Sequence, residues 1–345
     1  MMNLNNLIRK NIKAMKSYSS ARDEFKDLKT DMVFLDANEN PFETTLNRYP
    51  DPQQTALKEL ISKQKELPIN QVLLGNGSDE VLDLIVRAFC EPNQDSILTL
   101  PPTYGMYGVL AQLNSIENIE VPLSKDFNID IDQVLKQVKP STKLLFICSP
   151  NNPSGNIMDV NAVTRLLKAF DGLVVIDEAY IDFTTIESWM QHLNMFPNLI
   201  VTQTLSKAYG LAGIRLGTCY ASKEIIAVLN KIKPPYNINS LTQQAAIEAL
   251  QNNEVSDQVS SILREREKLA NALASCFFVK KIYPSDANFI LMKVDDANKR
   301  YDELLRHGIV IRNRTTQLGC ENCLRISLGT PAENKQLLTL LNTLK

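Results

Sequence analysis

Residues 143–177, KLLFICSPNNPSGNIMDVNAVTRLLKAFDGLVVID, decide the fold class of this chain. Residues 143–148 and 173–177 are apolar runs of strand length, and between them residues 160–170 carry apolar side chains at helical spacing. A strand, a helix and a second strand in this order form a parallel pair with a crossover helix. The stretch therefore predicts an α/β fold with a mostly parallel sheet.

The same alternation extends from about residue 70 to residue 220. Further strands are expected at residues 72–74, 96–100, 118–121, 199–204 and 215–220, and further helices at 79–90, 104–113 and 131–138. Ser78 is expected to cap the helix that follows it, because Asp79 and Glu80 then occupy the first turn. Seven strands alternating with helices predict a doubly wound sheet covered on both faces.

The pattern changes after Pro234 and Pro235. Long helices are expected at residues 241–250 and 255–276, then strands at 288–294, 309–312 and 323–327, with helices at 297–307 and 331–344. This predicts a large domain over residues 46–235 and a smaller α/β domain over 236–345. Residues 1–45 are expected to form an N-terminal arm and part of the small domain, packed against the C-terminal unit.

Composition excludes several classes of protein. The chain has 345 residues, 44% of them hydrophobic, and a net charge of −2, which argues against disorder and against a basic nucleic-acid-binding surface. No stretch approaches the roughly 18 apolar residues of a membrane span, and the N-terminal residues lack a signal-peptide core. We therefore expect a soluble cytoplasmic protein that binds neither nucleic acid nor membrane.

The six cysteines do not predict a metal centre. Cys320 and Cys323 form one C-x-x-C pair, but a zinc site needs two more ligands, and His192 and His307 are the only histidines. The other cysteines lie in apolar runs, as buried free thiols do.

Two polar motifs with ionisable groups follow predicted strands. Lys207 lies in TLSKAYGLAGIR (204–215), between Ser206 and Arg215, and Asp177 ends the strand 173–177, three residues before Tyr180. Taken alone, Lys207 has a second interpretation as a solvated surface lysine. Asp177 resembles a magnesium ligand, but the sequence lacks the glycine-rich phosphate loop that usually accompanies one.

Two further motifs also follow strands. The turn SPNNPSG (149–155) offers the amide of Asn152, and GNGSDE (75–80) places small residues before a helix, where free N–H groups favour anions. Each could equally be a plain turn. Because parallel strands end at one edge of a sheet, all four motifs are expected to converge on one crevice. Together they suit pyridoxal 5′-phosphate, whose aldehyde binds a lysine and whose ring nitrogen needs a carboxylate.

The motif order GNGSDE, SPNNPSG, VVIDEAY, TLSKAYGLAGIR and LRISLGT (324–330) resembles the fold-type-I aminotransferases over nearly the whole chain. Three N-terminal motifs, YSSAR (18–22), LDANENP (35–41) and NRYPD (47–51), are similar to the histidinol-phosphate aminotransferase family within that group.

This resemblance implies roles for the residues around the cofactor ring. Lys207 would form the Schiff base and carry the proton, and Asp177 would pair with the pyridinium nitrogen. Tyr180 and Asn152 would bond the 3-oxygen of the ring, and Tyr104 would stack on its face.

For the cofactor phosphate, the resemblance implies the backbone of Gly77, Ser78 and Asp79, with Ser206 and Arg215. Tyr49 in such enzymes reaches the phosphate of the other subunit's cofactor. The resemblance therefore implies a homodimer with shared active sites.

For the substrate, the resemblance implies that Arg325 and Arg312 bind the phosphate, with Arg325 also serving the carboxylate of glutamate. Arg314, two residues on from Arg312, is an alternative second ligand. Tyr18 would close over the substrate on an arm, and Asn38 would complete the set together with Tyr104 and Asn152.

The implied activity is amino transfer from L-histidinol phosphate to 2-oxoglutarate, a ping-pong reaction of histidine biosynthesis. Three alternatives remain. An aromatic or broad-specificity aminotransferase shares the cofactor residues, a phosphothreonine-type decarboxylase shares the phosphate requirement, and a non-catalytic regulator would need an additional domain.

Overall fold

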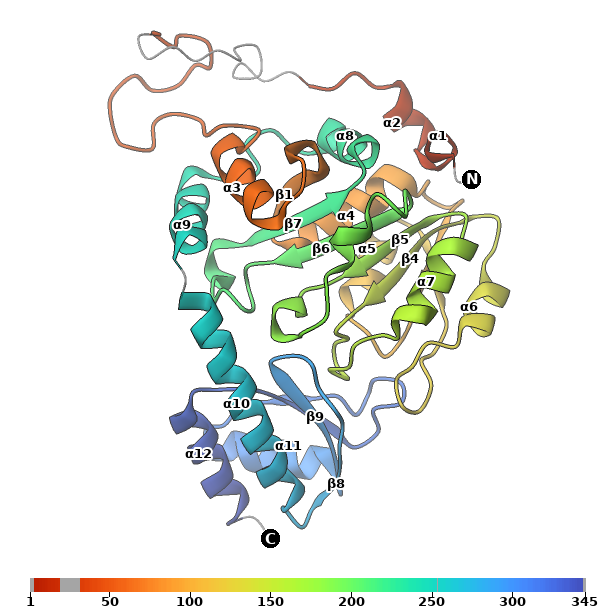
Figure 1. Ribbon diagram of the computed structural model, residues 1–345, viewed down its shortest axis with the longest axis vertical. Helices are drawn as coiled ribbons and strands as arrows, with labels where there is room; N and C mark the ends of the chain where they lie inside the picture. Colours follow the sequence, from red (N-terminus) through yellow and green to blue (C-terminus); the bar gives the residue numbers. More distant parts are fainter. Residues whose placement is uncertain (1–2, 19–31, 253, 344–345) are drawn as a thin grey trace.

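The computed structural model describes residues 3–18, 32–252 and 254–343, and its strands form two sheets (Figure 1). The seven-stranded sheet has the order β1-β7-β6-β5-β4-β2-β3. Its strands are β1 Val72–Asn76, β2 Ser96–Thr99, β3 Glu117–Glu120, β4 Thr142–Cys148, β5 Leu173–Asp177, β6 Leu199–Thr204 and β7 Leu216–Ala221. β7 runs antiparallel to the other six strands, which are parallel to one another, and this confirms the predicted mostly parallel sheet.

Helices cover both faces of this sheet because alternate strand residues belong to different cores. Val174 and Ile176 of β5 pack in one cluster with residues of α3 (Thr55–Lys65), α7 (Val160–Ala169) and α9 (Ser240–Gln251). Leu173 and Val175 pack on the other face with α4 (Ser78–Phe89), α5 (Met106–Leu113) and α8 (Lys223–Ile232). The remaining large-sheet helix, α6 (Ile131–Gln137), packs against α7. These four apolar side chains of β5 are fully buried, as expected for a strand inside a doubly covered sheet.

The start of α4 differs from the prediction that Ser78 caps it. Gly77 occupies the cap position with φ +77°, and Ser78 is the first helical residue. The chain turns from β1 into α4 through a left-handed conformation that favours glycine, so the cap falls on Gly77. Helix α5 likewise begins at Met106, two residues later than expected.

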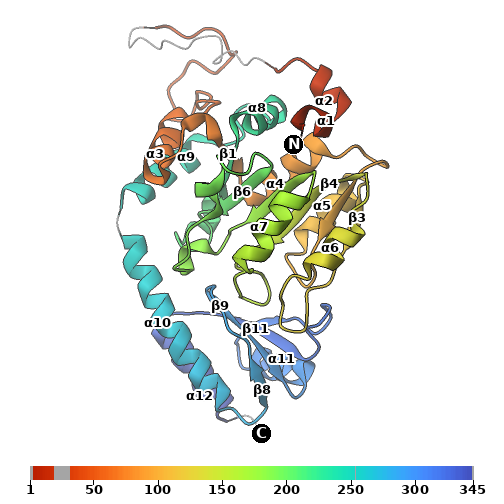
Figure 2. The same ribbon diagram turned by 45° about the vertical axis from the view of Figure 1, so that its right-hand side comes forward.

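The second sheet has the order β10-β11-β9-β8 and is antiparallel throughout. Its strands are β8 Val279–Ile282, β9 Phe289–Val294, β10 Arg312–Asn313 and β11 Cys323–Ser327, with helices α10 Glu254–Ala274, α11 Ala297–Arg306 and α12 Pro331–Leu341. The sequence missed β8, whose two central lysines are exposed, and the strand expected at 309–312 contributes only its last residue to β10. Figure 2 shows α10 leading from the large sheet to this smaller unit.

The N-terminal helices α1 (Leu4–Leu7) and α2 (Lys10–Ala14) lie on the large unit, so the expected packing against the C-terminal unit is wrong for these helices. Residues 1–2 and 19–31 of the expected N-terminal segment lie outside the described residues. Leu7 is buried in the same core as α4, and the Arg9 amide donates to the carbonyl of Ala88 over 3.1 Å. The apolar side of α1 therefore packs against α4. In Figure 1 the N-terminus lies far from the C-terminus. Within the described ranges, no helix is long and apolar enough to cross a membrane.

Candidate active site

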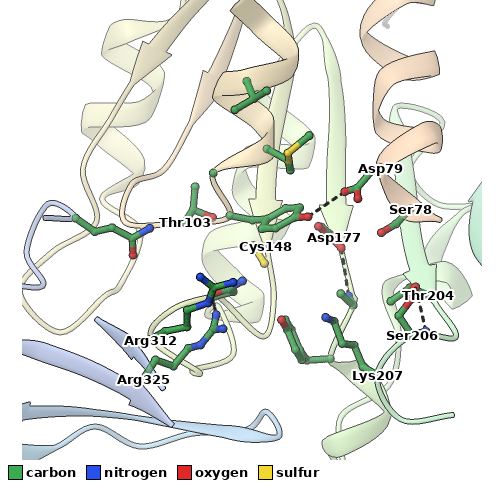
Figure 3. Close-up of a pocket in the computed structure, with 18 of the residues that line it drawn as sticks. Ser78, Asp79, Thr103, Cys148, Asp177, Thr204, Ser206, Lys207, Arg312 and Arg325 are labelled. Carbon is green, nitrogen blue, oxygen red and sulfur yellow. Dashed lines mark hydrogen bonds between the residues drawn. The ribbon is translucent and has the colours of Figure 1, made fainter. Parts of the chain in front are cut away.

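A cavity of about 510 Å³ lies where the large sheet faces the small one (Figure 3). Its volume is in the range of small-molecule sites. The predicted residues that line it are Ser78, Asp79, Tyr104, Asn152, Asp177, Tyr180, Ser206, Lys207, Arg215, Arg312 and Arg325.

The topology explains this convergence. Strands β1, β4, β5 and β6 are mutually parallel, and each ends at the cavity. Asp177 is the last residue of β5, Asn152 follows β4, and Lys207 follows β6. The large sheet therefore supplies its polar groups at the carboxyl edge, as open α/β sheets do.

Lys207 projects into this cavity beside Tyr180, with Nζ 5.7 Å from the centre of the phenol ring. Burial lowers the pKa of Lys207, and the positive charge of Arg325 lowers it further, while Asp177 raises it. A lower pKa leaves more of the amine unprotonated, which is the form that attacks a carbonyl.

Asp177 is a buried carboxylate with two hydrogen-bond donors. Tyr107 Oη donates to Oδ2 over 2.8 Å, and the Ala179 amide donates to Oδ1 over 3.2 Å. Burial raises the pKa of Asp177, and the Tyr107 hydrogen bond is the largest opposing effect. A carboxylate that is only 2% exposed suits a cationic partner in the cavity, such as a protonated ring nitrogen.

Tyr107 was not among the sequence candidates. It lies in the first turn of α5, three residues after Tyr104, and the helix expected at 104–113 contained both tyrosines, so their i, i+3 spacing was the available signal. Its ring is 1% exposed and stacks on Phe146 at a centroid distance of 4.9 Å.

The N-terminus of α4 forms an anion cradle with the loop after β6. A Cβ on Gly77 would come within 2.6 Å of Arg215 Nη2, so the arginine occupies the space that glycine leaves open. Asp79 accepts from Tyr104 Oη over 3.0 Å and lies 3.4 Å from Arg215 Nη2. Ser206 accepts from Thr204 Oγ1 at 3.0 Å on the same side of the cavity (Figure 3). Free helix amides, hydroxyls and a guanidinium are the donors that a phosphate monoester requires.

The small sheet supplies a second, more cationic end. Arg325 of β11 lies directly opposite Arg312 of β10, and Figure 3 shows the two side chains beside each other, across the cavity from Ser206. Arg325 Nη1 donates to Asn152 Oδ1 over 2.5 Å. Burial, followed by the charge of Arg314, lowers the pKa of Arg325 to about 10. Arg314 also lines the cavity, so the structure brings both alternatives, Arg312 and Arg314, to this end.

Three predicted residues lie away from this cavity in the same chain. Tyr49 stacks on Tyr236 at 4.5 Å and lines a separate hollow together with Asn38. Tyr18 is 73% exposed. Among the described residues, no cluster of His, Cys, Asp and Glu side chains is arranged to hold a metal ion.

Residues 24–341 match the family described as aminotransferase class I and II. The histidinol-phosphate aminotransferase of Flavobacterium psychrophilum is 60% identical over 342 residues, which cover 99% of each chain. This chain belongs to the histidinol-phosphate aminotransferase family of class I and II aminotransferases.

Solved structures of this aminotransferase family agree with the fold. The histidinol-phosphate aminotransferase of Clostridium acetobutylicum matches with a TM-score of 0.80 at 27% identity, covering 86% of this chain and 90% of that one. The enzyme of Sinorhizobium meliloti, in complex with pyridoxal 5′-phosphate, matches with a TM-score of 0.79 at 25% identity, covering 87% and 84%. These matches confirm the predicted fold-type-I architecture and the family resemblance.

Proposed function

We propose that this chain transfers the amino group of L-histidinol phosphate to 2-oxoglutarate, giving imidazole-acetol phosphate and L-glutamate in histidine biosynthesis. The observation that carries the proposal is one cavity in which Lys207 and Asp177 face a cationic end formed by Arg312 and Arg325. The first pair serves amino-group chemistry, and the arginines serve an anionic substrate group.

The cavity fits pyridoxal 5′-phosphate. A buried carboxylate, an amine of lowered pKa and a phosphate cradle at the α4 N-terminus match its ring nitrogen, aldehyde and phosphate respectively. When bound, this cofactor supplies the carbonyl that takes the amino group and a protonated ring that withdraws electrons from the reacting carbon.

The residues that hold the cofactor ring divide into two sets. Asp177 holds a proton on the ring nitrogen by ion pairing, and Tyr107 keeps that carboxylate in place. Tyr180 and Asn152 would hydrogen-bond the 3-oxygen of the ring, and Tyr104 would stack on its face.

The phosphate cradle consists of the backbone of Gly77, Ser78 and Asp79 with the side chains of Ser206 and Arg215. Lys207 Nζ would hold the aldehyde of the cofactor and, as a free amine, would remove the proton from the substrate Cα. Its lowered pKa favours this role because a protonated amine cannot accept that proton.

The substrate end consists of Arg325, which binds the anionic group of either substrate, and Arg312, which binds the phosphate. Guanidinium groups suit this task because each donates a pair of parallel hydrogen bonds to a phosphate or carboxylate. Tyr18 and Asn38 belong to the N-terminal segment that completes the substrate site.

The active form is a homodimer, in which Tyr49 reaches the cofactor phosphate of the other subunit. In support, the segment around Tyr49 exposes apolar side chains: Val33 is 83% exposed, Leu35 87% and Phe42 77%. Exposed apolar side chains close together in one segment are typical of a protein interface. Because α9 packs on the large sheet, we place the boundary between the large and small domains after α9 and not at residue 235 as expected from the sequence. We place the enzyme in the cytoplasm, where the six free thiols of the chain remain reduced.

The test is a steady-state assay of the purified protein with L-histidinol phosphate, pyridoxal phosphate and 2-oxoglutarate. We expect glutamate to form in an amount equal to the amine consumed, with no carbon dioxide released. Carbon dioxide release from O-phospho-L-threonine without an oxo acid would support the decarboxylase alternative instead.

A further inference from the structure

Three arginines meet at the cationic end of the cavity. Arg312 and Arg325 face each other across the β10–β11 pair, and Arg314 follows two residues after Arg312. Within the described ranges, none of the three forms an ion pair with a carboxylate. The cavity therefore presents three guanidinium groups whose charges are not neutralised by those parts of the protein.

Buried polar atoms at this end also lack partners. In the described part of the chain, Nε of Arg314, Nε of Arg325 and Oε1 of Gln317 are buried without a hydrogen-bond partner. Buried polar groups are normally paired, and unpaired ones indicate a bound water, ion or ligand. The two Nε–H groups are donors to which a phosphate oxygen can bind, whereas Oε1 of Gln317, which lines the same cavity, is an acceptor and does not bind an anion.

The loop that carries Arg314 is held in place by backbone hydrogen bonds. The Arg314 amide donates to Cys323 O over 2.9 Å, the Gln317 amide to Arg314 O over 2.9 Å, and the Cys320 amide to Gln317 O over 3.0 Å. Cys320 and Cys323 are both fully buried, which anchors the far end of the loop. Arg314 is therefore presented to the cavity from an ordered turn.

The charges of these arginines affect one another. After burial, Arg314 is the largest cause of the lowered pKa of Arg325, and Arg312 contributes as well. Burial and Arg312 together lower the pKa of Arg314. An anion relieves this repulsion in proportion to its charge, so a dianionic phosphate monoester gains more at this end than a carboxylate does.

The two substrates differ in the reach of their anionic groups. In histidinol phosphate, a methylene and an ester oxygen separate the phosphorus from the reacting carbon, whereas the α-carboxylate of glutamate is bonded to that carbon directly. The phosphate therefore extends further from the reaction centre and carries one more negative charge. It can engage donors beyond Arg325 that the α-carboxylate does not reach.

We propose that Arg314 is a third phosphate-binding residue and sets the preference of this enzyme for a phosphate monoester over a carboxylate. Arg312 and Arg314 are then joint ligands instead of alternatives. The proposal rests on the proposed histidinol-phosphate activity and deepens it.

The test uses the holoenzyme of Arg314→Gln in single-turnover half-reactions with three amines: L-histidinol phosphate, L-histidinol and L-glutamate. We expect the efficiency with histidinol phosphate to fall roughly tenfold or more, because a charged hydrogen-bond donor is lost. The efficiencies with histidinol and glutamate should stay within about threefold of wild type, which is less than the loss of one such bond. Arg314→Lys keeps the positive charge but loses the paired N–H donors of the guanidinium, so it should retain part of the preference for histidinol phosphate.

Arg306→Gln on the exposed side of α11 is the matched control and should leave all three efficiencies unchanged. If Arg314→Gln lowered the efficiency equally with all three amines, Arg314 would have a structural role. If the efficiency with histidinol phosphate were unchanged, Arg314 would have no role in phosphate binding. Either result overturns the proposal. The wild-type enzyme tests the proposed function separately, since equal conversion of histidinol and histidinol phosphate would overturn that function itself.

Discussion

Arg325 Nη1 donates a hydrogen bond to Asn152 Oδ1 over 2.5 Å, and this bond joins β11 of the small sheet to the turn after β4 of the large one. The bond fixes which end of the Asn152 amide faces the arginine. A residue proposed for the cofactor ring and a residue proposed for the substrate anion are therefore in direct contact. The arrangement of one depends on the other.

Arg325→Gln should impair both half-reactions, whereas Arg312→Gln should impair mainly the reaction of histidinol phosphate. Arg325 contacts Asn152 and is half-buried, while Arg312 is exposed at the rim of the cavity. The loss for each affected reaction should be about 1.5–3 kcal/mol, the range for a hydrogen bond to a charged group. Single-turnover rates of each variant with glutamate and with histidinol phosphate measure the two half-reactions. Equal losses of Arg312→Gln on the two substrates would contradict this division.

Lys207→Ala should abolish transamination and remove the absorbance of the lysine-bound cofactor. Lys207 supplies both the covalent link to the cofactor and the group that moves the Cα proton. Absorbance spectra and glutamate formation measure the two effects independently. Lys335→Ala on the exposed face of α12 is the control and should keep both. Turnover retained in Lys207→Ala would refute its assignment.

Tyr107→Phe should weaken catalysis by about 1–3 kcal/mol, because its hydroxyl donates the 2.8 Å bond that opposes the raised pKa of Asp177. Asp177→Ala should lose more, about 3–5 kcal/mol, since a buried cationic ring then lacks its counter-ion. The measurement is kcat together with the dissociation constant of pyridoxal phosphate. Tyr301→Phe on α11 serves as the control. If Tyr107→Phe had wild-type values of both, Tyr107 would have no positioning role.

Gly77→Ala should weaken cofactor binding. A Cβ there would approach Arg215 Nη2 to 2.6 Å, and the residue has φ +77°, a conformation that costs an L-residue about 1 kcal/mol or more. Displacing Arg215 removes a donor from the phosphate cradle. Equilibrium dialysis of pyridoxal phosphate measures the change. Gly213→Ala is the matched control, because its Cβ meets no atom within 4 Å in the described structure. Equal affinities of the two variants would contradict the cradle.

Glu178 should make stability depend on pH between about 4.5 and 7. Burial raises the pKa of Glu178 from 4.5 to about 7, although Ser188, Gln203 and the Trp189 amide all donate to its carboxylate. In this window the folded chain binds more protons than the unfolded one. The contribution of Glu178 to stability is therefore complete below pH 4.5 and is lost as pH rises through 7.

The side chain of Glu178→Gln cannot ionise. As pH rises from 4.5 to about 7, the free energy of unfolding of this variant should therefore increase by about 3 kcal/mol relative to that of wild type. Denaturant unfolding at several pH values measures the difference. Glu59→Gln on the exposed side of α3 should follow the wild-type profile. Parallel profiles of wild type and Glu178→Gln would show that the carboxyl does not titrate there.

The sequence predicted the large sheet and the motifs at its edge because both depend on local pattern. Leu173 to Ile176 form one apolar run that ends in Asp177, and a parallel strand buried on both faces requires such a run. Strand β8 was missed because Lys280 and Lys281 interrupt its apolar pattern on an exposed part of the small sheet.

Contacts between distant segments could not be read from the sequence. The bond of Tyr107 to Asp177 joins residues 70 positions apart, and that of Arg325 to Asn152 joins residues 173 apart. Neither pair has a local signature. The cap at Gly77 was missed because serine is the commoner capping residue, and the positive φ that decides the position is set by the turn between β1 and α4.

The most direct test of the account is a pair of half-reactions on the purified holoenzyme, followed by the absorbance of the bound cofactor. One sample receives L-histidinol phosphate and the other L-phenylalanine. We predict rapid conversion to the pyridoxamine form with the phosphate ester only. Comparable conversion with phenylalanine would contradict the phosphate-specific pocket and indicate a broader aminotransferase. If no cofactor absorbance appeared, even after pyridoxal phosphate is added, the assignment of Lys207 and of the other cofactor-binding residues would be contradicted.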